Sequence, residues 1–176
     1  AFGYQHYGIE PDLICVGKGM GGGVSLSGVI GRGHIMDLPD IGNMSSTHSA
    51  NPLVCAAGLA VLEEIESKNL IAETARKGEL LFGELRKLEA RFSDRLGESL
   101  GKGLIASVLF YKPGTREADG AFASKVCELA MRRGLLLVHT GRESIKLGPP
   151  LTIPDEALLE GVRVLGECIA DVQAAE

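Results

Sequence analysis

Near its start the chain reads PDLICVGKGMGGG over residues 11–23, and this stretch decides the fold. Residues 12–16 form a short apolar run that follows a proline and stops at a glycine, which is typical of a buried strand. Lys18 comes directly after that strand and is flanked by Gly17 and Gly19. Because glycine has no side chain, the backbone at both positions can approach a ligand closely. The pattern therefore predicts a lysine at the end of a buried strand, beside a ligand.

Such a lysine can act as an amine nucleophile. Desolvation lowers the pKa of a lysine, and the neutral amine is the form that attacks a carbonyl carbon to make a Schiff base. A solvated loop lysine is the simpler interpretation of Lys18, and the flanking glycines alone do not decide between the two.

The same glycines match a dinucleotide-binding pattern. Gly17, Gly19 and Gly22 have the GxGxxG spacing, and Asp37 follows at a suitable distance. That pattern needs a helix to begin at the glycines, whereas residues 24–30 resemble a second strand. We therefore disfavour a dinucleotide site.

A second polar stretch, SSTHSANP, occupies residues 45–52 and precedes an apolar helical segment. Hydroxyl groups and backbone N–H groups gathered before a helix N-terminus form a phosphate site, through hydrogen bonds and the helix dipole. Ser46 and Thr47 are the candidate phosphate ligands. A serine-rich helix cap without a ligand is the alternative interpretation.

The remaining chain alternates between strand and helix patterns, which favours an α/β architecture. A loop is expected at residues 33–50 and a glycine-rich break at 97–103. The predicted strands are 26–30, 104–111, 135–139 and 144–147, and the predicted helices are 53–65, 70–92, 120–133 and one that begins with a capping box of Thr152 and Asp155. A break near residue 69 predicts two domains, 1–68 and 69–176.

Composition excludes several classes of function. The 176 residues carry a net charge of −5 and no basic stripe, so no nucleic-acid partner is expected. No apolar run approaches the roughly 20 residues of a membrane span. The four cysteines are far apart and form no CxxC pair, which predicts neither a metal site nor disulfides and favours the cytoplasm.

Four motifs, in the same order, resemble those of one enzyme family. The lysine stretch at 11–23 and THSANPLVCAA at 47–57 resemble the lysine and threonine segments of class III (ω-type) aminotransferases, which are fold-type I enzymes that use pyridoxal 5'-phosphate (PLP). GKGL at 101–104 resembles the entry to their small domain, and LGPPLT at 147–152 resembles a late segment of it. The resemblance implies the C-terminal portion of such an enzyme, with 1–68 the remainder of the PLP-binding large domain and 69–176 the small C-terminal domain.

The resemblance also implies roles for particular residues. Lys18 would bind PLP as a Schiff base and transfer a proton during amino transfer from an amino donor to a keto or aldehyde acceptor. Thr47, with Ser46, would bind the cofactor phosphate across a homodimer interface. An aminomutase or racemase of the same superfamily, or a non-catalytic C-terminal fragment, remain alternatives. The aspartate that faces the pyridine nitrogen would lie upstream of Ala1, so residues 1–176 alone are expected to be inactive.

The sequence departs from the family pattern at two positions. Ser25 replaces a usual proline, and Lys146 stands where members that bind an α-carboxylate often have arginine. Lysine lacks the two-pronged geometry with which arginine holds a carboxylate. Lys146 is a candidate substrate residue, and its identity indicates a substrate without an α-carboxylate or a carboxylate held by another residue; a plain surface position is the alternative.

Overall fold

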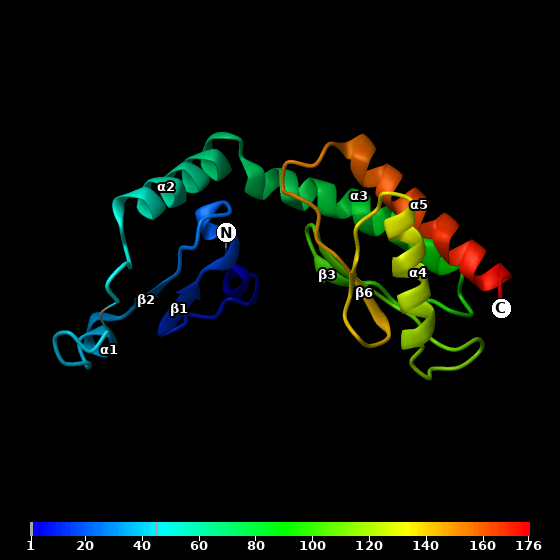
Figure 1. Ribbon diagram of the computed structural model, residues 1–176, viewed down its shortest axis with the longest axis horizontal. Coiled ribbons are helices and arrows are strands. Elements are labelled where there is room, and N and C mark those ends of the chain that lie inside the picture. Colours follow the sequence, from blue (N-terminus) through cyan, green and yellow to red (C-terminus); the bar gives the residue numbers. More distant parts are fainter. Residues whose placement is uncertain (1, 45) are drawn as a thin grey trace. The chain divides into compact units, whose positions relative to one another are not determined.

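The computed structural model describes residues 2–44 and 46–176, which divide into two units, residues 1–71 and 72–176. Figure 1 traces the order of their elements. Ser45, the first residue of the predicted phosphate stretch, lies outside the described residues. The predicted domain boundary at 68/69 falls in the turn between two helices.

The first unit contains a two-stranded antiparallel sheet and one long helix. Strands β1 (Leu13–Val16) and β2 (Gly28–Gly31) pair along their whole length, from Leu13 with Gly31 to Val16 with Gly28. The 3-10 helices η1 (Gly3–Tyr7) and η2 (Lys18–Gly21) precede and follow β1. A short helix, α1 (Gly33–Met36), lies in the segment that we predicted to be a loop, because one helical turn is too short to produce a periodic apolar pattern.

Helix α2 (Pro52–Ser67) begins and ends with recognisable caps. The Asn51 side chain accepts a hydrogen bond from the Val54 N–H at 3.2 Å, and Pro52 occupies the first turn. Asn69, just beyond the helix, has a left-handed φ of 48°. Midway, Gly58 is buried against Leu26, whose Cδ2 would lie 2.4 Å from a Cβ at this position. The missing side chain thus allows α2 to pack closely on the turn after β1.

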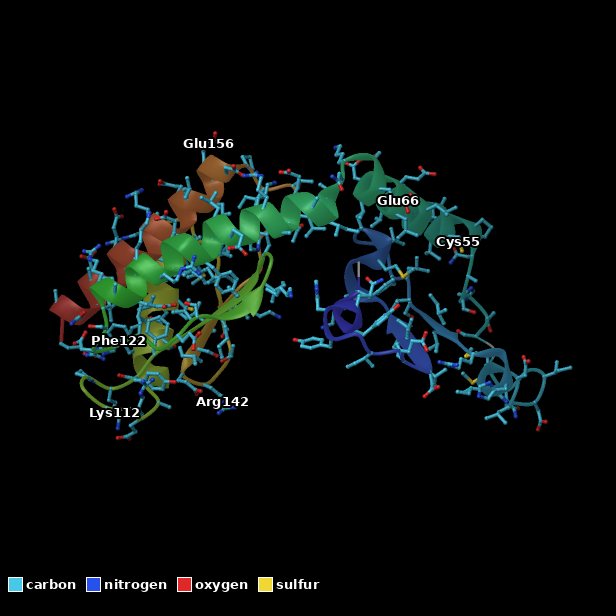
Figure 2. The ribbon with its side chains drawn as sticks, turned by 180° about the vertical axis from the view of Figure 1, so that it is seen from behind. Cys55, Glu66, Lys112, Phe122, Arg142 and Glu156 are labelled. Atoms are coloured by element: carbon cyan, nitrogen blue, oxygen red, sulfur yellow. The ribbon has the colours of Figure 1, made fainter. Side chains whose placement is uncertain are left out.

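The second unit is built on a four-stranded antiparallel sheet in the order β3-β4-β6-β5. Its strands are β3 (Leu100–Lys102), β4 (Ile105–Leu109), β5 (Val138–His139) and β6 (Ser144–Leu147). Its helices are α3 (Leu70–Arg91), which begins two residues before the unit, α4 (Gly120–Arg132) and α5 (Asp155–Ala174). Arg142 lies at the tip of the β5–β6 hairpin (Figure 2).

A hydrophobic core fills one side of this sheet. Alternate residues of β4 and β6 are buried, and they join side chains from α3, α4 and α5 in one cluster. Phe122, on the first turn of α4 (Figure 2), contacts the Phe110 ring at a centroid distance of 5.7 Å. The other face of the sheet keeps Ile105, Val138 and Lys146 exposed. None of the helices described here is long and apolar enough to cross a membrane.

The structure corrects three predictions of local structure. Helix α5 begins at Asp155 with Pro154 as its N-cap residue, so the capping box of Thr152 is wrong; the fixed φ of proline suits the helix entry instead. Strand β3 lies in the predicted glycine-rich break, where glycines on an edge strand hide the strand pattern. The strand predicted at 135–139 pairs only at Val138 and His139.

Candidate functional site

Lys18 occupies an unusual backbone position as the first residue of η2, two residues after β1. Its φ is 52°, in the left-handed region that residues other than glycine, asparagine and aspartate rarely enter. Successive turns hold it there, with Met20 N–H donating to Gly17 O at 3.2 Å and Gly22 N–H donating to Gly19 O at 3.1 Å. A conformation of this kind costs about 1–3 kcal/mol and clusters at functional sites. The left-handed backbone therefore singles out Lys18 independently of the sequence motif.

The side chain of Lys18 is accessible. The residue is exposed, and over residues 2–44 and 46–176 its amine takes part in no hydrogen bond or ion pair. A Cβ added to the neighbouring Gly19 would meet nothing within 4 Å, so the backbone next to Lys18 faces open space. This combination leaves the amine free to react with a carbonyl ligand.

The turn that carries Lys18 rests on α2. Gly21 is buried, and a Cβ there would lie 3.1 Å from Leu26 Cβ. Across the contact, a Cβ on Gly58 of α2 would lie 3.7 Å from Met20 O. Gly58 thus allows η2 and α2 to approach closely, while Gly21 allows η2 to pack against Leu26, so the turn that carries Lys18 is bounded by β1 on one side and α2 on the other.

Residues 46–51 of the predicted phosphate stretch form the turn before α2. Ser49 donates through both its N–H and its hydroxyl to Ser46 O, at 3.1 and 2.8 Å, and Asn51 Nδ2 donates to His48 O at 3.1 Å. Ala50 completes the turn with a left-handed φ of 51°. The Ser49 hydroxyl, which we did not predict as a phosphate ligand, is engaged by the turn.

Thr47 and Ser46 keep exposed side chains in this turn. Within the described ranges, neither hydroxyl has a hydrogen-bond partner. Both precede the N-terminus of a 16-residue helix, where anions are favoured by the helix dipole. They are therefore available for a phosphate oxygen.

Thr47 and the Lys18 turn meet α2 at different positions, Thr47 before its first residue and the Lys18 turn at Gly58. The lysine turn packs at Gly58, six residues and therefore about 9 Å along α2 from Pro52. No hydrogen bond joins the two residues in the part of the chain that the structure describes.

Lys146 lies in the second unit, on the face of the sheet that the helices do not cover. Its neighbours Ile145 and Leu147 are buried in the core, and its cross-strand partners are Ser107 on β4 and Val138 on β5. It lines a cavity of about 370 Å³ at the edge of the sheet, where it is the one charged side chain in the lining. The volume is within the range of small-molecule sites.

The sequence profile of the family described as aminotransferase class-III matches residues 1–169 of this chain. The chain belongs to this family.

Relatives in the class III family include enzymes with different activities. A 4-aminobutyrate aminotransferase of Mycobacterium tuberculosis is 38% identical over 167 residues, which are 94% of this chain and 37% of that protein. A leucine/methionine racemase of Thermococcus litoralis is 38% identical over 174 residues, 98% of this chain and 39% of that protein. The chain thus spans less than half the length of the curated relatives that it matches.

The fold agrees with the family. The crystal structure of acetylornithine aminotransferase from Elizabethkingia anophelis superposes with a TM-score of 0.85 at 30% identity, covering 96% of this chain and 41% of that one. The predicted fold class, the C-terminal part of a fold-type I transferase of mixed α/β architecture, is confirmed.

The residues of this class III chain fit PLP. Its aldehyde needs an accessible amine, which Lys18 offers, and its phosphate needs donors at a helix N-terminus, which Thr47 and Ser46 offer. A Cβ on the neighbouring Gly19 would meet nothing within 4 Å, so the backbone beside Lys18 is open to a ligand.

Proposed function

We propose that the intact protein is a PLP-dependent aminotransferase, in which Lys18 binds the cofactor through Nζ. It moves an amino group from an amino donor to a keto or aldehyde acceptor. The observation that carries this proposal is the Lys18 turn: a left-handed lysine at a strand end, with an exposed amine and open space at Gly19. Membership of the class III family supports it independently.

Lys18 has two successive roles in this proposal. When bound, PLP withdraws electrons from the substrate carbon and makes its proton acidic. In this setting the Lys18 Nζ, when not bonded to the cofactor, would accept that proton as a general base and later donate it as a general acid. Exchange of the left-handed turn for a regular one would move Nζ, so the backbone strain serves this positioning.

Thr47, with Ser46, binds the cofactor phosphate in our proposal, and it does so on the second subunit of a homodimer. Two observations support an intersubunit role: the hydroxyls lack partners among the described residues, and the Lys18 turn packs on α2 at Gly58, six residues beyond the helix start that Thr47 precedes. Helix α2 also exposes Leu53, Leu59 and Leu62, which indicates that another surface covers it.

The domain assignment follows from these roles. We propose that residues 1–68 are the remainder of the PLP-binding large domain and that residues 69–176 are the small C-terminal domain. We also propose a cytoplasmic location, with which four free cysteines are consistent. Lys146 is proposed as a single positive contact for an acidic group of the substrate, since it is the only charge in its cavity lining.

A racemase is the second candidate, because the Thermococcus litoralis relative is 38% identical over 98% of this chain. The two activities are separated by incubating the intact protein and PLP with L-leucine or 4-aminobutyrate, with and without an α-keto acid. Amino transfer that requires the keto acid supports the aminotransferase. Formation of D-leucine without any acceptor would replace it with the racemase.

A further inference from the structure

Lys77 is a buried lysine in the second unit that the proposed function does not use. It lies on α3 and is 7% exposed. Its Nζ donates to the backbone carbonyl of Leu151 at 3.3 Å, and this is its one hydrogen bond within residues 2–44 and 46–176. Removing an ammonium group from water is expensive unless it gains partners. The Leu151 carbonyl and the nearby Asp155 carboxylate are the groups that compensate the Lys77 ammonium.

The carbonyl that Lys77 holds belongs to an irregular link, residues 148–154, between β6 and α5. Pro149 and Pro150 have no N–H to donate, and one backbone hydrogen bond lies within the link, from Ile153 N–H to Pro150 O at 3.0 Å. The path of the link therefore depends on side chains from elsewhere.

Two adjacent residues of α3 supply those contacts. Arg76 binds the Asp155 carboxylate with both terminal nitrogens at 2.8 Å, which fixes the end of the link at the start of α5. Lys77 fixes its middle at Leu151. The beginning of the link is fixed by β6, which is paired on both sides.

This link forms a wall of the cavity that contains Lys146. Gly148, Pro149 and Ile153 line the cavity, whereas Lys77 and Arg76 lie outside it. Lys146 itself is two residues before Gly148. Movement of Leu151 would therefore change both the cavity wall and the residues that follow Lys146.

We infer that Lys77 is a positioning residue, which holds the 148–154 link so that the cavity beside Lys146 keeps the shape that receives the substrate's acidic group. The inference rests on the proposed role of Lys146. Lys77 acts through the Leu151 carbonyl and touches neither substrate nor cofactor.

The test is Lys77→Met in the intact protein, because methionine fills a similar volume without a buried charge. Hydrogen exchange of the peptide covering 148–154 should become faster while the rest of the second unit keeps its protection. KM for an amino donor with a carboxylate should rise roughly three- to tenfold at unchanged kcat, which is the loss of one hydrogen bond's contribution. The melting temperature should stay the same or rise.

Two variants serve as controls. Lys87→Met removes an exposed lysine of the same helix, paired only with Glu84 at 2.5 Å, and should change none of these quantities. Lys77→Arg keeps a donor in place and should restore much of the exchange protection. Unchanged exchange at 148–154 in Lys77→Met overturns the inference, as does a general loss of protection and stability, which would make Lys77 a folding residue only.

Lys146→Met separates this inference from the proposed function. If Lys146→Met leaves KM unchanged, Lys146 does not contact the substrate. The proposed effect of Lys77 on substrate binding is then overturned, even when hydrogen exchange at 148–154 responds. If KM rises in both Lys146→Met and Lys77→Met, the positioning role is supported.

Discussion

The two units of this chain differ in how much of their apolar surface they bury. The second unit encloses Phe110, Phe122, Ile145, Leu165 and Ile169 almost completely. The first unit buries only Gly21, Gly58 and Leu70 among its described residues. Several of its large apolar side chains are exposed, including Leu38, Ile41, Met44 and Leu53. One unit therefore carries its own core, while the unit with the proposed cofactor lysine depends on further surface to cover it.

The helices show the physical origin of this difference. In α5, apolar residues gather on one side and are buried, which suits a helix packed on a sheet. In α2, apolar residues occur around the whole circumference, and only Gly58 is buried. A helix that is apolar all round belongs in the interior of a larger protein. We therefore expect α2, on which the Lys18 turn packs, to be covered in the proposed homodimer.

Separating the units should give the largest effect. We expect residues 72–176 to fold alone into a cooperative domain and residues 1–71 to remain largely unfolded, because a core is needed to offset the entropy of ordering the chain. Circular dichroism with urea titration of both fragments measures this. A cooperative transition in residues 1–71 would contradict the comparison.

Truncation of single apolar side chains sharpens the contrast. Phe122→Ala should lower the unfolding free energy of the second unit by about 3–5 kcal/mol, because the ring is fully buried. Leu59→Ala in α2 should change the stability of residues 1–176 by less than about 0.5 kcal/mol. In the intact protein the same change should cost about 2–5 kcal/mol, since we expect that surface to be covered. Equal effects of Leu59→Ala in both contexts would mean that α2 stays exposed.

Removing the N-cap side chain of a helix should have a smaller effect on stability, and it can be compared between α4 and α2. Asp119 caps α4 at the Phe122 N–H at 3.0 Å and also binds the buried Arg95 at 3.0 Å. Asp119→Ala should therefore cost about 3 kcal/mol or more in urea unfolding, because it leaves a buried charge with one partner fewer. Asn51→Ala removes only the cap of α2 and should cost about 1 kcal/mol in the intact protein. A reversed order would contradict our account of the two caps.

The smallest expected effect is a pH dependence. Hydrogen bonds from Arg76 hold the pKa of Asp155 below its ordinary value, so its contribution to stability is complete above the pKa of the unfolded state and is lost as pH falls through the lower folded value. The difference in urea midpoint between residues 72–176 with Asp155 and with Asp155→Asn should stay constant above about pH 4 and shrink below it. A difference that persists at lower pH would show that the charge is not responsible.

The corresponding ion pair of the first unit should respond less. Arg32 binds Glu10 and Asp12, but both carboxylate side chains are mostly exposed. Exposed pairs of this kind contribute little. Glu10→Gln in the intact protein should leave the urea midpoint unchanged across the same pH series.

The sequence predicted the elements whose pattern is local. Strand β6 has the predicted bounds, residues 144–147, and α2, α3 and α4 lie within two residues of theirs. It also identified the Lys18 motif, because an apolar strand followed by glycines is readable without tertiary contacts. The features that it missed, α1 and β3, are too short to carry a period.

The burial of Lys77 was missed for a different reason. Lys77 precedes Leu81 and Leu85 at intervals of four residues and therefore shares their buried side of α3. That spacing could have revealed it, but a lysine is normally assigned to the solvent face. The Leu151 carbonyl, which accepts the hydrogen bond from its ammonium group, is distant in sequence, so this contact follows only from the fold. The left-handed backbone of Lys18 likewise has no signal in the sequence.

The central claim is that Lys18 binds PLP. The most direct test is borohydride reduction of the intact protein after incubation with PLP, followed by peptide mass mapping. Our account predicts a pyridoxyl adduct on Lys18 and its loss in Lys18→Ala. No adduct, or an adduct confined to another lysine such as Lys146, would contradict it.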